Sequence, residues 1–241
     1  MSDLIPISYR PTFEELDTQQ RALVDELLKI FQPIIDKYNY DIEDDTILND
    51  LTYKNLKPFI IDQYTVLRYL RQHDFNLELA KNALKKTVIW RQKYNIDTLL
   101  DSPPQFLLNA LEEYNKLFPN SFLDRDMYGR PLYYSLIGKV QVNNINTYCC
   151  PEKAELCHIW DMEKKMRMCR EISRQTDHIY IDTYVNVLDF NDWGLAHAKM
   201  LPQIQQMTQL DEAHYPQTLG TSIMLNTPTL FSTIWSAISS F

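Results

Sequence analysis

The C-terminal residues 214–241 read HYPQTLGTSIMLNTPTLFSTIWSAISSF and carry three structural signals in a row. Pro216 and Gly220 indicate a turn. The apolar segment Ser222–Asn226 follows and predicts a short strand that is buried on both sides. After Pro228, large apolar side chains recur at three- and four-residue intervals, as on one face of a helix, at Phe231, Ile234, Trp235, Ile238 and Phe241. A turn, a buried strand and a helix in this order indicate an α/β fold.

Strands and helices also alternate upstream of this stretch. Residues 132–140 and 184–190 are predicted strands, because aromatic and aliphatic residues alternate along them. Residues 151–174 are predicted to form a helix that begins at a proline, which the first turn of a helix tolerates. A further helix over 195–213 contains Pro202, which starts a fresh turn or kinks the helix. Since helices connect the strands, we expect a mostly parallel sheet.

The N-terminal part has helical periodicity and no strand signal. Three amphipathic helices are predicted, over residues 13–38, over 62–70, and from Asn76 through Trp90. Asn76 is the expected N-cap of the third helix. Residues 39–60 are polar and acidic and read as a loop with one helical turn at most, while Pro103-Pro104 separates the helices from the rest. We therefore expect an N-terminal helical region over 1–100 and a ligand-binding domain over 101–241.

The composition excludes several classes of protein. The 241 residues are 45% hydrophobic, which is enough for an ordered core. A net charge of −8 argues against nucleic-acid binding, which needs a basic surface. No apolar run approaches the roughly 18 residues that span a bilayer, and the N-terminus lacks a secretory signal. We therefore expect a cytoplasmic protein that binds no nucleic acid.

Residues suited to catalysis or metal binding do not form a recognisable pattern. The cysteines at 149, 150, 157 and 169 lack the paired C-x2-C spacing of a zinc site, so we expect reduced thiols and no metal. Phosphate-binding glycine loops and the G-x-S-x-G nucleophile motif do not occur in the sequence, and the five histidines are scattered. The sequence predicts neither an enzyme nor a cofactor.

Four motifs resemble those of the CRAL-TRIO lipid-binding family, which includes the fungal phosphatidylinositol-transfer proteins. The first is the C-terminal stretch itself, and the second is LRYLRQHDFNLELA at 67–80, similar to the family's N-terminal helical motif. The third motif is DMYGRP at 126–131, which is similar to the segment that leads into a strand of the family. The fourth is the end of the predicted strand near Asp189, which is similar to the end of another family strand. The resemblance implies a helical bundle followed by a mostly parallel sheet with crossover helices. Because the family's domain continues beyond the position of Phe241, it also implies that the C-terminal part is missing.

The resemblance further implies where a lipid would bind. In the family, the sheet is the floor of an apolar pocket, and a few polar groups hold the headgroup. Phosphatidylinositol-binding members have a basic pair in place of His73 and Asp74, and an acid in place of Gln217. A carboxylate about 4 Å from a phosphate costs roughly 4 kcal/mol at a surface-like dielectric, so we expect weak or absent phosphatidylinositol binding. The expected ligand-binding residues are Tyr133, Tyr184, Asn186, Gln217, His73 and Asp74.

The predicted C-terminal helix corresponds to the start of the family's mobile gate, which covers the pocket and meets the membrane. Its expected gate and membrane residues are Phe231, Ile234, Trp235 and Ile238. The resemblance therefore implies a phospholipid-transfer type of protein, peripheral to membranes, whose partners are a lipid ligand and a transient membrane surface.

Two alternatives remain open. The altered headgroup residues and the missing C-terminal part also suit a regulatory interaction module that keeps the fold without transferring lipid. Some fungal relatives bind haem, and His73, Tyr133 and Tyr184 are of a suitable type to ligate iron. Phe190, however, stands where the haem-binding relatives have a tyrosine.

Overall fold

The computed structural model describes residues 13–39, 61–142, 151–175 and 180–228. The chain divides into two compact units, Met1–Asp101 and Ser102–Phe241, which are treated separately below. None of the helices in the described ranges is long and apolar enough to cross a membrane.

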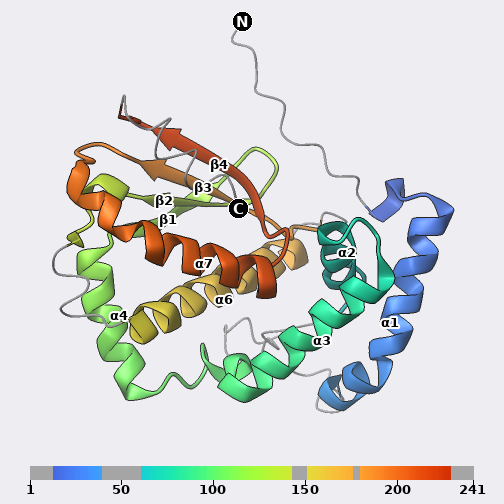
Figure 1. Cartoon of the computed structure of the whole chain (residues 1–241). Helices are drawn as coiled ribbons and strands as arrows, with labels where there is room; N and C mark the ends of the chain where they lie inside the picture. The colour runs from blue at the N-terminus through green and yellow to red at the C-terminus, as the bar shows by residue number, and fades with distance from the viewer. Residues whose placement is uncertain (1–12, 40–60, 143–150, 176–179, 229–241) are drawn as a thin grey trace, which may run out of the picture. The chain divides into compact units, whose positions relative to one another are not determined.

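Helices make up the described part of the N-terminal unit (Figure 1). They are η1 (Phe13–Glu15), α1 (Thr18–Asn39), α2 (Gln63–Gln72), α3 (Leu77–Tyr94) and η4 (Ile96–Thr98). The predicted helix over 13–38 is therefore divided by a break before Thr18. A capping box explains the break: the Asp17 carboxylate accepts from the Gln20 backbone N–H at 2.7 Å, and Gln20 Oε1 accepts from the Asp17 N–H at 3.2 Å.

The other two N-terminal helices begin at polar caps. Asp62 accepts from the Thr65 backbone N–H and Asn76 from the Leu79 N–H, which confirms Asn76 as the N-cap of α3. The three helices enclose a core of fully buried aliphatic side chains, among them Val24, Leu27, Val66, Leu70 and Leu84. The predicted loop over 39–60 lies, except for Asn39, outside the described residues.

A four-stranded sheet with helices packed against it forms the C-terminal unit (Figure 1). Its elements are α4 (Gln105–Leu117), β1 (Asn120–Arg125), β2 (Pro131–Ser135), η5 (Ile137–Lys139), α6 (Pro151–Gln175), β3 (Tyr184–Asp189), η6 (Leu195–Met200), α7 (Leu201–His214) and β4 (Leu219–Leu225). The strand order is β1-β2-β3-β4, in which β2, β3 and β4 are parallel and β1 is antiparallel to β2. The expected α/β fold with a mostly parallel sheet is confirmed.

Strand β1 and helix α4 were not predicted. In β1, the residues after Asn120 are all exposed, so the strand has no buried face to produce an alternating pattern. The turn that joins β1 to β2 was predicted, and the Asp126 carboxylate closes it by accepting from the backbone N–H groups of Tyr128 and Arg130. Gly129 supplies the positive φ, 82°, that this turn needs.

Strand β2 is shorter than predicted. It ends at Ser135, and the chain then forms η5 rather than continuing as a strand to Val140. Gly138 in η5 permits a close approach of two backbone segments, because a Cβ at this position would lie 1.8 Å from the backbone oxygen of Asn191. The chain after β2 therefore packs directly against the backbone that follows β3.

The described C-terminal helices lie on one side of the sheet, and α6 contacts strand β2 (Figure 1). The predicted fresh turn near Pro202 is present, because η6 changes to α7 at Leu201. The prediction that strand 222–226 is buried on both sides was wrong. In β4 the side chains of Leu219, Ile223 and Leu225 are exposed, and β4 is the last strand of the described sheet. Composition alone does not distinguish a strand at the edge of a sheet from a central one.

Candidate functional site

Three of the predicted ligand residues share one face of the sheet. In the parallel register, Tyr133 of β2 pairs with Asn186 of β3, and Asn186 pairs with Ser222 of β4. Tyr184 lies two residues before Asn186 and therefore on the same face. Its ring meets the Tyr133 ring edge to face, with centroids 6.1 Å apart. The structure thus brings Tyr133, Tyr184 and Asn186 together.

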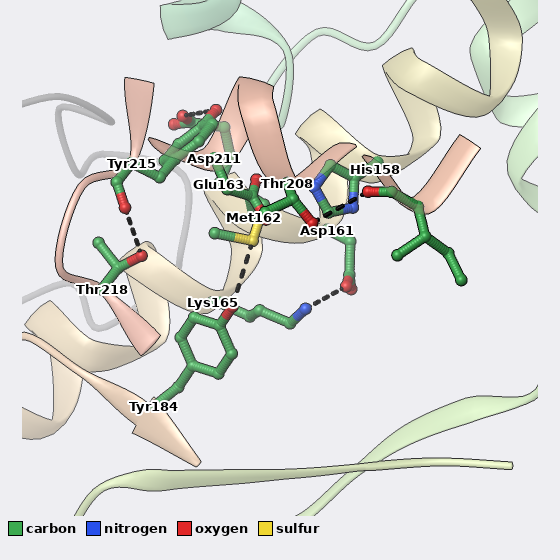
Figure 2. Close-up of polar contacts among 11 residues, drawn as sticks. His158, Asp161, Met162, Glu163, Lys165, Tyr184, Thr208, Asp211, Tyr215 and Thr218 are labelled. Carbon is green, nitrogen blue, oxygen red and sulfur yellow. Dashed lines mark hydrogen bonds and ion pairs between the residues drawn. The ribbon is translucent and has the colours of Figure 1, made fainter. Parts of the chain in front are cut away.

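Helix α6 covers the two tyrosines with a charged residue. The ammonium nitrogen of Lys165 lies 5.0 Å from the ring centroid of Tyr133 and also 5.0 Å from that of Tyr184. One turn earlier, the Asp161 carboxylate pairs with it at 2.6 Å (Figure 2). Lys165 is only 8% exposed, so this ammonium is held in the interior by one carboxylate and two ring faces.

The phenol groups of both tyrosines point into the protein. Tyr133 and Tyr184 are 3% and 5% exposed, and their hydroxyls donate to the sulfurs of Met168 and Met162, each at 3.7 Å (Figure 2 shows Tyr184). Burial raises the pKa of Tyr184 to about 12 and also raises the pKa of Tyr133. The nearby Lys165 charge acts in the opposite direction on both phenols but is the smaller effect. Both phenols are therefore neutral at physiological pH in this arrangement.

The charge of Lys165 is stable in this setting. Burial by itself would lower the pKa of its ammonium, but the nearby Asp161 carboxylate and the tyrosines outweigh burial and raise it. Lys165 is therefore a permanent positive charge beneath the sheet at neutral pH.

Asn186 differs from its neighbours because one of its polar atoms is unsatisfied. Its Oδ1 is buried and has no hydrogen-bond partner among the described residues. A buried acceptor without a donor costs about 1–3 kcal/mol. This oxygen is thus ready to accept a hydrogen bond from a ligand.

A second set of contacts fastens α7 and the turn before β4 to α6 (Figure 2). His158 Nε2 lies 2.7 Å from Asp211 Oδ1, joining the two helices. The Tyr215 hydroxyl donates to the buried Glu163 carboxylate at 2.7 Å, and the Thr218 hydroxyl donates to the Tyr215 carbonyl at 2.8 Å. These bonds set the position at which β4 begins beside β3.

The remaining predicted residues lie elsewhere. Gln217 is in the turn between α7 and β4, half-buried, with a positive φ of 60°. His73 and Asp74 belong to the N-terminal unit, in the turn between α2 and α3, where His73 is half-buried and Asp74 is exposed. The predicted gate residues Phe231, Ile234, Trp235 and Ile238 lie outside the described residues.

Sequence reasoning missed Lys165, Asp161 and Glu163. A signal existed, because Cys157, Asp161, Lys165 and Cys169 recur every four residues, and both cysteines are buried. Charged residues four apart on a helix usually mark an exposed face, so this row was not recognised. Within the described ranges, no cluster of three or more His, Cys, Asp or Glu residues could hold a metal.

Comparison with protein families matches residues 115–241 to the family described as "CRAL/TRIO domain". This match covers more than half of the chain, which therefore belongs to the CRAL/TRIO family. The resemblance seen in the sequence is confirmed.

Several proteins of known name are similar to this chain. The "SEC14 cytosolic factor" of Yarrowia lipolytica is 28% identical over 182 residues, 75% of this chain and 36% of that protein. The "Sec14 cytosolic factor" of Schizosaccharomyces pombe is 25% identical over 186 residues, 75% of this chain and 63% of that protein. The "Phosphatidylinositol/phosphatidylcholine transfer protein SFH7" of Arabidopsis thaliana is 24% identical over 197 residues, 81% of this chain and 35% of that protein. The chain spans about one third of the first and third of these relatives.

A solved structure supports the fold. The crystal structure of Sfh5 superimposes with a TM-score of 0.63 at 16% identity, covering 93% of this chain and 76% of that one. At this identity the likeness concerns the fold alone.

Proposed function

We propose that this chain binds a phospholipid on the Tyr184/Asn186 face of the sheet and carries it between membranes. The observation that supports the proposal most is the buried Asn186 Oδ1 that lacks a partner, in a chain of the CRAL/TRIO family. A headgroup hydroxyl that donates to this oxygen would remove the cost of leaving it unpaired. The acyl chains would be shielded from water by apolar residues of the same unit.

The proposed carrier binds phosphatidylinositol weakly or not at all. Its relatives include a phosphatidylinositol/phosphatidylcholine transfer protein by name. In this chain, His73, Asp74 and Gln217 replace the basic pair and the acid of the phosphatidylinositol-binding members. A carboxylate such as that of Asp74 repels a phosphate, whereas the basic residue that it replaces would attract one.

The proposed action is physical rather than chemical, since extraction and release of a lipid need no covalent step. The carrier would act from the cytoplasm and touch membranes transiently through the predicted 231–238 helix face. Two relatives are called cytosolic factors, in keeping with such a location.

A second candidate function is a regulatory module of the same fold that does not transfer lipid. The observation in its favour is that Tyr133 and Tyr184, both expected to hold a ligand, already bond to residues of α6. Such a module would be purified without a lipid.

Native mass spectrometry of the purified chain, with organic extraction of any bound lipid, tests the proposal. We expect one bound phospholipid per chain and at least fivefold less in Asn186→Val, which keeps a strand-forming side chain but lacks the amide. Asn109→Ala is the matched control, because Asn109 is an exposed amide on α4. An empty wild-type protein that also takes up no phospholipid from vesicles would contradict the carrier proposal and favour the regulatory module.

A vesicle transfer assay tests the headgroup. We expect labelled phosphatidylinositol to move no faster than in the absence of protein. Transfer of phosphatidylinositol as fast as that of the co-purified lipid would overturn the proposal of weak binding.

A further inference from the structure

Lys165 occupies a position that suits a ligand cation. Recognition of quaternary ammonium groups commonly uses aromatic rings arranged around the positive charge, within about 6 Å of each centroid. Tyr133 and Tyr184 present such a pair of rings, and the Lys165 ammonium lies 5.0 Å from both. The space over the Tyr133 and Tyr184 rings, where a ligand cation would bind, is therefore occupied by the Lys165 side chain.

The neighbouring lysine shows that this arrangement is not a general property of α6. Lys164 is exposed and lies 5.3 Å from the ring of Trp160. A lysine over one ring at the surface is an ordinary contact, weakened by water. Lys165 instead has its ammonium buried over two rings and paired with the Asp161 carboxylate.

Two features of this face disfavour a second cation. The positive charge of Lys165 repels another ammonium at short distance, more strongly in the interior than in water. The unsatisfied Asn186 Oδ1 needs a donor, and a quaternary ammonium has no N–H to donate. A headgroup with hydroxyls and no positive charge satisfies both conditions.

We propose that Lys165 is a specificity-determining residue, which fills the Tyr133–Tyr184 site and excludes choline headgroups in favour of small, uncharged, hydroxyl-bearing headgroups such as glycerol on the lipid phosphate; the larger inositol headgroup is disfavoured separately, as proposed above. This inference rests on the proposed function. It assigns to this chain a substrate class that omits phosphatidylcholine.

The test is competition between two lipids in the same vesicle. Full-length protein is incubated with vesicles of equimolar phosphatidylcholine and phosphatidylglycerol, and the bound lipids are counted by native mass spectrometry. We expect at least tenfold more phosphatidylglycerol than phosphatidylcholine in wild type and in Lys164→Met, the matched control. Equal amounts of the two lipids in wild type would overturn the inference without any variant.

Removal of the internal cation should abolish the preference for phosphatidylglycerol. Lys165→Met leaves Asp161 unpaired, so the double variant Asp161→Asn/Lys165→Met is made beside it to keep the site neutral. In either variant that keeps the wild-type circular dichroism spectrum, we expect the phosphatidylcholine to phosphatidylglycerol ratio to rise at least tenfold. A folded variant with the wild-type ratio would show that Lys165 does not determine specificity.

A small probe separates this inference from the proposed function. Tetramethylammonium binding is followed by the NMR shifts of the tyrosine ring protons. If wild type takes up no lipid, the carrier proposal fails. The inference then stands only if the double variant binds tetramethylammonium at least tenfold more tightly than wild type, and falls if both bind equally.

Discussion

Lys165 shows how a single residue can carry a charge inside the C-terminal unit of a CRAL/TRIO chain. Removing an ammonium from water is unfavourable, and its 2.6 Å pair with Asp161 together with two tyrosine rings compensates for the lost hydration. Asp161 is the one negative group that these contacts place beside Lys165, so its loss leaves an uncompensated buried charge.

The Asp161–Lys165 pair should therefore matter for stability. Asp161→Asn is expected to lower the free energy of unfolding by about 2 kcal/mol. This loss is smaller than that from breaking a fully buried ion pair, because the Asp161 side chain is partly exposed. The control is Glu112→Gln, which weakens a pair of the same spacing with Lys116 at the surface and should change stability by less than about 0.5 kcal/mol. Urea denaturation measures both, and equal effects would contradict the interpretation of Lys165 as buried.

Stability should also fall at alkaline pH. Unfolded tyrosine loses its proton near its ordinary pKa of 10.0, while Tyr184 in the folded protein keeps it until about 12. Between these values the unfolded state binds fewer protons, so the free energy of unfolding decreases as pH rises. The raised pKa values of Lys165 and Tyr133 act in the same direction.

Denaturation at pH 9 to 11.5 measures this dependence. In Tyr184→Phe, the free energy of unfolding should fall less steeply with pH than in wild type. In the control Tyr128→Phe, at an exposed position of the β1–β2 turn, it should fall as steeply as in wild type. Identical slopes for wild type and Tyr184→Phe would refute the raised pKa.

At the scale of elements, the end of β3 is a meeting point of three segments. The Asp189 carboxylate accepts from the Tyr134 hydroxyl at 2.5 Å and from the Asn226 side-chain amide and Asn191 backbone N–H at 2.9 Å. These bonds lower the pKa of Asp189, the Tyr134 bond most. Gly138 in η5 packs against the same loop, so the C-terminal ends of β2, β3 and β4 are tied together.

Gly138→Ala should disturb this junction. An added Cβ would lie 1.8 Å from the Asn191 oxygen and 2.9 Å from the Trp193 nitrogen, both backbone atoms that cannot rotate away. We expect a loss of at least about 2 kcal/mol in the free energy of unfolding. Gly194→Ala is the control, because a Cβ there meets nothing within 4 Å and should change stability by less than about 1 kcal/mol. A Gly138→Ala protein as stable as wild type would show that the loop after β3 can move.

At the scale of the whole molecule, the family match and the likeness to Sfh5 establish the fold. Membership in the CRAL/TRIO family rests on residues 115–241, which include the sheet and α6. The chain spans only about a third of the length of two of its relatives.

At this scale we also propose that the chain contacts membranes through the helix face predicted over 231–238. Trp235→Ala should weaken binding to liposomes about tenfold or more, because an aromatic ring at the membrane interface contributes buried apolar area. Ser236→Ala, beside it in sequence and polar in the wild type, should bind as wild type does. Co-sedimentation with liposomes measures both, and unchanged binding of Trp235→Ala would count against insertion of this face.

Local patterns in the sequence determined most of the fold. Caps such as Asn76, the Asp126–Pro131 turn, the helix that begins at Pro151 and the strand that begins at Tyr184 depend on near neighbours in the chain, so they were predictable. The alternation of strands and helices then required a mostly parallel sheet. Strand β1 was missed because it is exposed along nearly its whole length, and β4 was misjudged as buried although Leu219, Ile223 and Leu225 are exposed. Helix α4 was missed although its buried side chains recur at helical spacing.

The tertiary structure alone decided the chemistry of the candidate site. Resemblance selected Tyr184 and Asn186, but only strand register places them with Tyr133 on the α6 face. Lys165 reads in the sequence as half of a surface ion pair with Asp161, and only packing buries it between the two rings. The physical reason is that hydrogen-bonded turns and caps form between residues close in sequence, whereas burial and the electrostatics that depend on it arise when distant segments meet.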